Sequence, residues 1–514
     1  MLIYLVDFIV CALALALYVE LRNRRIYKYL PPGPPRLPLI GSLLEVPERL
    51  EWEVYAQWGR QLNSDMVHIA VGQTPIIVVN SIRTANDLLD KRSSLYSDRP
   101  WMPMLCDLMG WGWATSIIRY SEEWREQRRL FQNHFHPLNT AVYEDTVAEF
   151  VRECLSSILD TPQDFMDHVR SLPGGVSLSL AYGIKTKPLN DPFTKLAEDA
   201  LETIGKVASP GAFLVDIMPV LKYMPEFLPG AGFKRKAREW YQLMVMFREK
   251  PFAFARKQIE LGYAKPSFTS MCLEGLDASK PIEPQLETVI DAAATVYAGA
   301  AHTTVSAIST FIIAMIYYPD VQKKAQAELD QVVGSSRLPE FSDRRDLPYI
   351  TAILKEVLRW KPVTPLGIVH RLMEDDTYNG YIFPKGSLFL PNQWAMLHNE
   401  EDYPDPNTFK PERYLNSKGE VDPKVRDPAT IAFGFGRRAC PGSHIAEAMI
   451  WLTAASILST FNIKPAVDEN GTAIMPSLVY RSTTISFPQP FKCDLKPRSM
   501  DAEVFIQTLK SDAE

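Results

Sequence analysis

The sequence is poor in cysteine, and its cysteines lie far apart. There are 6 in 514 residues, and no two of them form a Cys-x-x-Cys pair. A disulfide framework or a structural zinc site is therefore not expected, and the body of the chain is expected in a reducing compartment. The sequence also lacks an excess of basic residues, since 55 Lys and Arg face 61 Asp and Glu for a net charge of -6. That balance argues against a nucleic-acid-binding protein.

Nucleotide-binding fingerprints and repeats are missing as well. The sequence contains no Gly-x-Gly-x-x-Gly fingerprint and no flavin domain, so electrons from a nicotinamide cofactor would have to come through a separate protein. It contains no internal repeat and no low-complexity tract. What is present, 46% hydrophobic and 23% charged residues, is typical of a globular protein with a large core. We expect one catalytic domain over residues 42–500 and a C-terminal tail over residues 501–514.

Residues 1–21 are predicted to form a transmembrane anchor. Its first 19 residues are apolar except for Asp7, and as a helix they would reach about 28 Å, enough to span the core of a bilayer. Basic residues follow it and none precedes it, so the body is predicted on the cytosolic side. A cleaved secretory signal is disfavoured, because a basic start is missing and the Ala-Leu-Ala stretch lies inside the apolar run. Residues 22–41 are predicted to form a basic, proline-rich hinge.

Hydrophobic periodicity predicts a mainly α-helical fold with small β-sheets at its edge (α+β). Two apolar runs within Met66–Val79, separated by Gly-Gln, indicate two strands. Val289–Tyr318 is apolar enough for a second membrane span, but it has no basic flank and carries His-Thr-Thr in its middle. It is therefore predicted as a long central helix. Other helices are predicted over Thr146–Leu159, Leu347–Trp360 and His444–Leu458.

Cys440 lies in the stretch IAFGFGRRACPG, residues 431–442. A helix is predicted to begin just after it, and the free N–H groups and dipole of a helix start favour a thiolate. The glycines of the stretch let the backbone approach a large flat ligand, and its two arginines add positive charge. A thiolate in such a loop suits axial ligation of haem iron. The alternatives are a buried structural cysteine and a zinc site with His444, which lacks further ligands.

The order Phe433-x-x-Gly436-x-Arg438-x-Cys440-x-Gly442 resembles the haem-binding signature of the cytochrome P450 family. Three further motifs follow the order and spacing of that family, and the match covers essentially the whole chain: Trp124-x-x-x-Arg128, Glu356-x-x-Arg359, and Arg413 in FKPERYL. Together with the anchor and the hinge, they resemble the microsomal type. The resemblance implies the cytochrome P450 fold after an N-terminal transmembrane helix. It also implies haem b as the cofactor, with Cys440 as the ligand of its iron.

The resemblance also implies roles for the other motif residues. Glu356, Arg359 and Arg413 would form a buried cluster that holds the cysteine loop, although an isolated Glu-x-x-Arg is usually a surface ion pair. The propionate groups of the haem would receive one further contact, from His370 or from Arg371. The sequence leaves this choice open. The residues implied to bind haem or to shape its loop are Trp124, Arg128, Phe433, Gly436, Arg438, Cys440 and Gly442.

The predicted central helix departs from the family where oxygen is activated. The family usually reads Ala/Gly-Gly-x-Asp/Glu-Thr-Thr/Ser, and this chain reads GAAHTT over residues 299–304. Thr303 is kept, Ala300 replaces a glycine, and His302 replaces the acid that helps relay protons. An imidazole can also relay protons, because its pKa lies near neutrality. Two other interpretations stay open: His302 points away and is structural, or slow proton delivery favours uncoupled turnover or chemistry that needs fewer protons.

The substrate pocket is implied only by positions in the pattern of the family. Such a pocket would be apolar and would suit a terpenoid, a polyketide or an aromatic or indole metabolite. The alternative for its tryptophans and methionines is ordinary packing. Gly211–Trp240 resembles the membrane-dipping substrate-access segment of the family, with a plain surface helix pair as the alternative. The candidate pocket residues are Trp101, Met104, Trp113, Ala300, Thr303, Val363 to Val369 and Leu478 to Tyr480.

These resemblances imply a haem-thiolate monooxygenase of the fungal natural-product branch, which includes hydroxylases of tryptamine and oxidases of aromatic polyketides. Electrons from NADPH would come through cytochrome P450 reductase, with cytochrome b5 as a further candidate partner and Arg129 and Arg437 as candidate docking residues. The implied location is the endoplasmic reticulum membrane, single-pass, with the catalytic domain in the cytosol. Two other classes stay open. One is a haem-thiolate isomerase, dehydratase or peroxygenase. The other is a non-catalytic haem or ligand carrier, and the presence of Thr303 argues against it.

Overall fold

The structure, a computed structural model, describes Tyr4 and residues 27–38, 40–71, 74–207 and 212–511. Apart from Tyr4, the predicted anchor at residues 1–21 lies outside these ranges, and so do hinge residues 22–26 and 39. The described residues form a mainly helical molecule with small sheets, which confirms the predicted fold class.

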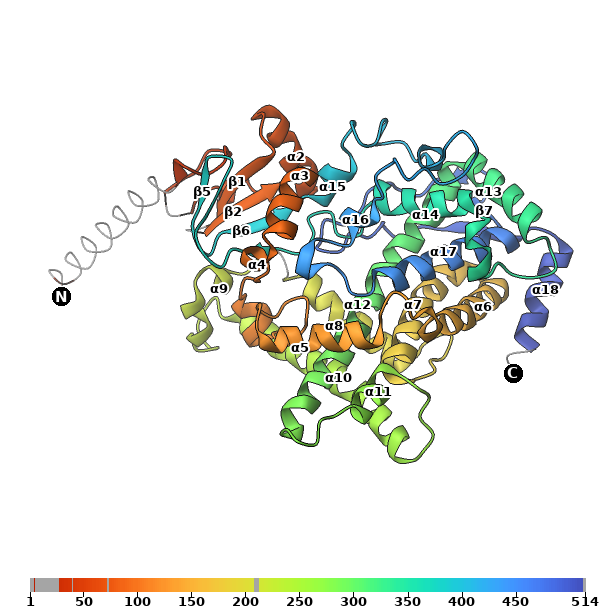
Figure 1. Ribbon diagram of the computed structural model, residues 1–514, viewed down its shortest axis with the longest axis horizontal. Coiled ribbons are helices and arrows are strands. Elements are labelled where there is room, and N and C mark those ends of the chain that lie inside the picture. Colours follow the sequence, from red (N-terminus) through yellow and green to blue (C-terminus); the bar gives the residue numbers. More distant parts are fainter. Residues whose placement is uncertain (1–3, 5–26, 39, 72–73, 208–211, 512–514) are drawn as a thin grey trace.

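Most of the body is helical, and its helices are arranged around α12 (Figure 1). Helices α5, α7, α8, α10, α14 and α17 all pack against α12. The helices of the described residues are α2 (Glu51–Gln61), α3 (Ile82–Ala85), α4 (Ser93–Tyr96), α5 (Glu122–His134), α6 (Glu144–Asp160), α7 (Phe165–Tyr182), α8 (Pro192–Gly205), α9 (Leu214–Ile217), α10 (Gly232–Glu260), α11 (Phe268–Glu274), α12 (Ile282–Tyr317), α13 (Pro319–Val332), α14 (Pro348–Trp360), α15 (Gln393–Leu397), α16 (Ala429–Ala432), α17 (Ser443–Thr460) and α18 (Met500–Ser511).

Helix α12 is the core helix of the molecule. It has 36 residues, a mean hydropathy of 1.5 in its most apolar stretch, and so the length and composition to cross a membrane. However, 78% of that stretch is buried inside the protein. A helix that is apolar on all sides belongs in a core when other helices surround it. The prediction of a central helix over Val289–Tyr318 is confirmed.

The main sheet lies at one end of the molecule, beside α2 (Figure 1). Its strand order is β1-β2-β6-β3, with β2 parallel to β6 and the other pairs antiparallel. Its first two strands are rich in β-branched residues and almost entirely buried, as expected for strands inside a fold. The strands are β1 (Met66–Val71), β2 (Thr74–Val79), β3 (His370–Arg371), β4 (Asp376–Tyr378), β5 (Tyr381–Phe383), β6 (Leu388–Pro391), β7 (Phe461–Val467), β8 (Ala473–Ile474) and β9 (Cys493–Pro497).

Both ends of the described body are fixed to it. The N–H of His68 in β1 donates to the carbonyl of Pro32 at 3.0 Å, and the N–H of Ser42 donates to the carbonyl of Ala70 at 2.8 Å. The proline-rich part of the hinge therefore lies along β1. At the other end, the segment predicted as a tail begins with α18, which packs on α6 and buries Ile506 completely.

Candidate functional site

Cys440 lies on a short loop between the turn Gly436–Arg438 and the start of α17. Its N–H donates to the carbonyl of Phe433 at 2.8 Å, which closes the loop. The N–H of Gly442 bonds to the Cys440 sulfur, and the guanidinium of Arg128 lies near it; both lower the pKa of the thiol. Cys440 is exposed, yet the protein atoms around its sulfur desolvate the thiol and outweigh both effects, so the pKa of Cys440 is raised. The predicted pull toward the thiolate is thus present but smaller than the cost of desolvation, and a bound metal ion would supply the rest.

The glycines of the loop serve the protein's own packing. Gly436 has φ of +53°, and a Cβ at this position would collide with the carbonyl oxygen of Leu89 in the helical turn η2 (Asn86–Lys91). Around Gly442, by contrast, a Cβ would meet nothing within 4 Å. The sequence assigned the close approach at Gly436 to a flat ligand. The structure shows that it lets the loop pack against η2.

Three arginines converge beside this loop: Arg99 is buried, and Arg128 and Arg438 are partly buried. Arg99, Arg128 and Arg438 each donate to backbone carbonyls, at distances between 2.6 and 3.0 Å. Asp98 exerts an attraction on both Arg99 and Arg438, but its carboxylate pairs with Arg371 at 2.9 Å. Within the described part of the chain, none of these three arginines has an ion pair with a carboxylate. The sequence motifs include Arg128 and Arg438. They do not include Arg99, because its neighbours in SDRPW show no recognisable spacing.

Burial and mutual repulsion act on these guanidinium groups. Burial, followed by the charge of Arg99, lowers the pKa of Arg438 to about 8, and burial lowers the pKa of Arg99 to about 9. Buried charges without partners are costly, so the arrangement favours binding of an anion. A haem has two propionates for such a cluster and an iron for the thiol of Cys440. The residues present therefore fit a haem.

Trp124 packs on the arginines and is itself held by the start of α5. The hydroxyl of Ser121 accepts a hydrogen bond from the N–H of Trp124 at 3.2 Å, which caps the helix. The Trp124 ring is 6% exposed, and it lies 4.7 Å from the guanidinium of Arg438 and 5.8 Å from that of Arg128. Contacts of a cation with an aromatic face restrict both side chains. Trp124 thus orients the two arginines of the motifs.

Strand β3 places His370 and Arg371, the two candidates for a further propionate contact, in different surroundings. Neighbouring residues of a strand point to opposite faces. His370 is buried, its Nδ1 lies 2.8 Å from the carbonyl of Tyr96, and burial together with the nearby Arg99 and Arg438 lowers its pKa well below the usual value. Arg371 points the other way, to its ion pair with Asp98. The structure brings His370, and not Arg371, to the arginine cluster.

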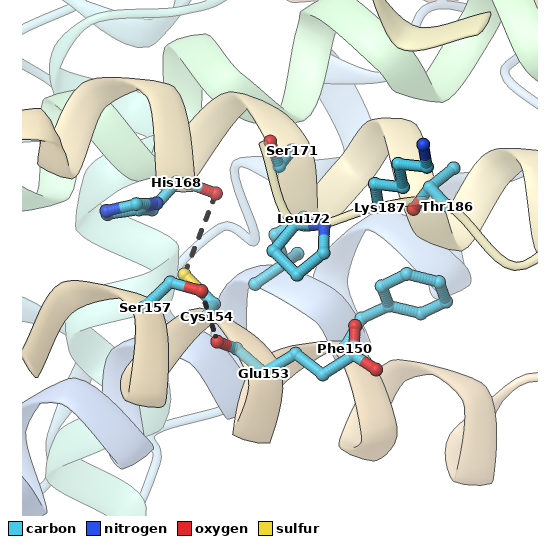
Figure 2. A pocket seen from close by; sticks show the side chains of 10 residues that line it. Phe150, Glu153, Cys154, Ser157, His168, Ser171, Leu172, Thr186 and Lys187 are labelled. Atoms are coloured by element: carbon cyan, nitrogen blue, oxygen red, sulfur yellow. Dashed lines mark hydrogen bonds between the residues drawn. The ribbon is translucent and has the colours of Figure 1, made fainter. Parts of the chain in front are cut away.

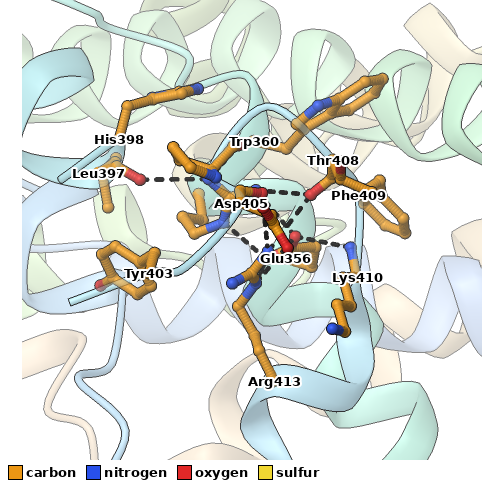
Figure 3. Close-up of polar contacts among 12 residues, drawn as sticks. Glu356, Trp360, Leu397, His398, Tyr403, Asp405, Thr408, Phe409, Lys410 and Arg413 are labelled. Carbon is orange, nitrogen blue, oxygen red and sulfur yellow. Dashed lines mark hydrogen bonds and ion pairs between the residues drawn. The ribbon is translucent and has the colours of Figure 1, made fainter. Parts of the chain in front are cut away.

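Glu356, Arg359 and Arg413 lie together in the core (Figure 3). Arg359 donates to the two carboxylate oxygens of Glu356 at 2.7 and 2.8 Å, and Arg413 approaches to 3.2 Å. The backbone N–H of Lys410 adds a bond to Glu356 at 2.8 Å, and Arg359 also donates to the carbonyl of Pro406 at 2.7 Å. The cluster therefore ties α14 to the segment that leads to Arg413.

The GAAHTT stretch lies in the middle of α12 and is among the less buried parts of that helix. The hydroxyl of Thr303 donates to the carbonyl of Gly299 at 2.7 Å. His302 packs against the ring of Phe487 at 5.8 Å and makes no hydrogen bond to another described residue. Burial, and then the charge of Arg170, lowers the pKa of His302 to about 4, against a smaller opposite effect of Glu202. The imidazole is neutral at physiological pH.

The candidate pocket residues fall into two groups. Met104 and Val369 are buried and Trp113, Ala300 and Val363 are partly buried, so these can line an interior space. The side chains of Trp101 and Leu478 are 38% and 37% exposed. Trp101 donates its Nε1–H to Asp107 at 2.8 Å on the surface, so it lies at the outer edge of the site rather than inside it.

A hairpin that the sequence did not indicate lies against α12. Tyr480 pairs with Pro488, and the N–H of Arg481 donates to the carbonyl of Phe487 at 2.7 Å. We call residues 480–488 the 480–488 hairpin. Its strands are too short to produce an alternating pattern in the sequence.

The candidate docking residues lie on the surface next to α5. Arg129 is 63% exposed and 3.8 Å from Glu122, and Arg437 is exposed and donates to the hydroxyl of Tyr120. Tyr120 packs on Trp124 at 5.1 Å, so this basic surface is one layer away from the arginine cluster.

A separate small cavity lies between α6 and α7 (Figure 2). Cys154 contacts the carbonyl of His168 at 3.7 Å there, and Ser157 donates to the carbonyl of Glu153 at 2.8 Å. None of its lining residues belongs to the site around Cys440, and its Glu153 and His168 are bonded to Lys185 and Thr161 of the protein.

Comparison with known proteins agrees with the motifs. The model of the family "Cytochrome P450" matches residues 31–488. Among curated proteins, the chain is 44% identical to the cytochrome P450 monooxygenase ple1 of Rhodocybe pseudopiperita over 496 residues, which is 96% of this chain and 94% of that protein. It is 42% identical to cytochrome P450 monooxygenase 98 of Postia placenta, over 97% and 96% of the two chains. It is 40% identical to the tryptamine 4-monooxygenase of Psilocybe cyanescens, over 92% and 94%.

Proposed function

The chain belongs to the cytochrome P450 family, and from this premise we propose that it is a haem-thiolate monooxygenase that inserts one oxygen atom of dioxygen into an apolar secondary metabolite. The observation that carries the proposal is the position of Cys440 beside one buried and two partly buried arginines that have no ion pair with a carboxylate in the described chain. The thiol of Cys440 is a ligand for the iron of a haem, and the three arginines beside it are partners for its propionates.

The residues of the site have separate roles in this proposal. Cys440 would bind the iron, and Arg99, Arg128 and Arg438 would hold the propionates, with His370 as a neutral neighbour. A haem held in this way supplies the activation of dioxygen at a thiolate-ligated iron. Glu356 and its two arginines fix the segment that leads to the cysteine loop, because a buried carboxylate with all of its bonds made resists displacement.

In this proposal, residues of α12 deliver the protons. The hydroxyl of Thr303 holds a water or a hydrogen-bond acceptor close to the distal face, and it can exchange partners because it now bonds only to its own helix. The neutral imidazole of His302 has one donor and one acceptor nitrogen, which is the arrangement that passes a proton without a lasting change of charge.

The substrate is proposed to be a terpenoid, a polyketide or an aromatic or indole compound. Apolar side chains form the candidate walls, among them Met104, Val363 and Val369. Such walls stabilise a bound apolar ligand, and they offer no polar partner to a buried charge. The 40% identity to a tryptamine 4-monooxygenase supports the aromatic class among these.

NADPH-cytochrome P450 reductase is the proposed electron donor, with cytochrome b5 as a second partner, on the basic surface of Arg129 and Arg437. The endoplasmic reticulum membrane is the proposed location, with the N-terminal segment as the anchor. A second membrane contact is supported by a surface next to α9, where large apolar side chains are exposed beside the basic start of α10. The exposed side chains are Leu214, Met218, Val220, Tyr223 and Phe227.

Expression of the full chain with a reductase in a metabolite-rich host tests the proposal. We expect a reduced, CO-bound spectrum with the thiolate band, and NADPH-dependent products that are heavier than their precursors by one oxygen atom. A spectrum without the thiolate band, in a folded protein that holds haem, contradicts the proposal. The Cys440→Ser variant is the matched control, because it keeps the shape of the loop and removes the sulfur.

One observation favours a second candidate, a haem-thiolate isomerase, dehydratase or peroxygenase. The position that is normally acidic carries His302, whose pKa is about 4, so it is not a source of protons at neutral pH by simple ionisation. Product formation that requires neither NADPH nor oxygen uptake would favour this candidate.

A further inference from the structure

The 480–488 hairpin and the segment before it follow one face of α12 residue by residue. The hydroxyl of Ser306 donates to the carbonyl of Ser486 at 2.5 Å, and the hydroxyls of Thr310 and Tyr480 lie 3.0 Å apart. Farther along the helix, the hydroxyl of Tyr317 donates to the carbonyl of Pro476 at 2.6 Å. These side chains are 6% exposed or less at Ser306, Thr310, Tyr480 and Ser486.

His302 is the next member of the same face. Residues four apart on a helix lie one above the other, so His302, Ser306 and Thr310 form one stripe. The hairpin covers this stripe in register: Phe487 on His302, Ser486 on Ser306 and Tyr480 on Thr310. The N–H of Ser486 also donates to the carbonyl of Val363 at 2.8 Å. The hairpin is therefore held on two sides when it reaches His302.

The imidazole of His302 lacks the usual means of fixing its orientation. It makes no hydrogen bond to another residue in the described ranges, and the edge-to-face contact with Phe487, at 5.8 Å and 88°, is its only ring contact there. Two charged groups act on it, Arg170 of α7 and Glu202 of α8, and neither is bonded to it. Edge-to-face contacts of aromatic rings contribute about 1 kcal/mol beyond area burial, enough to select one rotamer.

We propose that Phe487, held in register by the Ser306–Ser486 hydrogen bond, positions the His302 imidazole for proton delivery. The role of His302 in proton delivery rests on the proposed function, whereas the positioning itself is a property of the protein alone. Phe487 is a positioning residue, because it acts through His302. The departure from the family in the GAAHTT stretch is thus matched by a specific partner on a distant segment.

The test uses the full-length, haem-loaded protein and the variant Phe487→Leu. Hydrogen–deuterium exchange at the imidazole C2 position, read by peptide mass, reports how open each histidine is. We expect the exchange at His302 to accelerate at least about threefold, because loss of the ring admits water to the imidazole. Phe487→Tyr keeps the ring edge and should restore the slow exchange. Phe491→Leu is the matched control, since Phe491 packs on Phe165 and not on α12.

Ser306→Ala tests the register independently of the ring. It removes the bond to Ser486, and we expect a smaller acceleration at His302, of about twofold. Ser309→Ala is its control, because Ser309 is equally buried and bonds only to Val305 of its own helix. An unchanged exchange rate at His302 in Phe487→Leu overturns the proposal, and so does an equal acceleration in Phe491→Leu.

The fraction of NADPH that appears as product separates this inference from the proposed function. If His302 relays protons, both His302→Ala and Phe487→Leu lower this fraction and raise peroxide release, and Phe487→Tyr recovers it. Faster C2 exchange with an unchanged product fraction supports the positioning by Phe487 and contradicts the relay.

Discussion

The guanidinium of Arg359 donates to both carboxylate oxygens of Glu356, at 2.7 and 2.8 Å, and both side chains are completely buried. Such a pair adds little to stability relative to an apolar pair, but removal of one partner leaves the other charge without compensation. We therefore expect Glu356→Gln to lower the free energy of unfolding by about 3 to 5 kcal/mol. Chemical denaturation followed by circular dichroism measures this change.

A surface acid supplies the control for this prediction. Glu122 on α5 also contacts two arginines, at 2.7 and 3.8 Å, but its side chain is 64% exposed. Pairs of this kind are worth about 0 to 1 kcal/mol, so Glu122→Gln should be nearly neutral. Equal effects of the two variants would show that the buried cluster is not a structural centre.

Gly436 and Gly442 give a direct test of how the cysteine loop is packed. A Cβ at Gly436 meets the carbonyl of Leu89 and requires a left-handed residue, whereas a Cβ at Gly442 meets nothing. Gly436→Ala should therefore cost at least about 2 kcal/mol of unfolding free energy, and Gly442→Ala well under about 1 kcal/mol. Thermal unfolding of the two variants in parallel checks the difference. A larger loss in Gly442→Ala would contradict this interpretation, and it would indicate that the glycines allow a close approach to a ligand instead.

Arg99 should hold haem although no sequence motif contains it. It is 4% exposed and donates to the carbonyls of Ser116, Ile368 and Val369, which aims it at the arginine cluster. Loss of a charged hydrogen bond to a propionate costs about 2 kcal/mol, so Arg99→Leu should release haem roughly 30-fold more readily. Transfer of haem to apomyoglobin measures the rate. Arg119→Leu is the control, because Arg119 is exposed and its guanidinium lies over Trp101, 5.7 Å away, at the surface.

The sequence predicts those parts of the site that depend on neighbours along the chain. The cysteine loop, the Trp124 and Arg128 pair and the Glu356 and Arg359 pair each lie within one turn or loop, so spacing is enough to predict them. Arg99 and Phe487 reach the site through contacts with segments more than 100 residues away, and local patterns carry no sign of such contacts. The different surroundings of His370 and Arg371 depend on the direction of a two-residue strand, which is too short to show a period in the sequence.

The same distinction applies to the fold. Long periodic segments such as α6, α12 and α17 lie where the sequence predicts them, because their apolar residues specify a buried face by themselves. The position of the 480–488 hairpin depends on α12 instead. Hydroxyl-to-carbonyl bonds with α12 hold the hairpin and the segment before it, and those bonds exist only after both segments have folded together.

His302 should also make the protein less stable in acid. The pKa of its imidazole is lowered to about 4 in the folded protein, mainly by burial, against about 6.5 in an unfolded chain. Between these values the unfolded state binds a proton that the folded state does not, so this contribution to stability is present above about pH 6.5 and is lost as the pH falls toward about 4. The slope is at most about 1.4 kcal/mol per pH unit. We expect His302→Gln to reduce the loss of unfolding free energy between about pH 7 and about pH 5 by up to about 2 kcal/mol. The exposed His136 is the control, and His136→Gln should leave the slope unchanged. Urea denaturation at both pH values is the measurement, and an unaltered slope in His302→Gln would mean that the imidazole is hydrated in the folded protein.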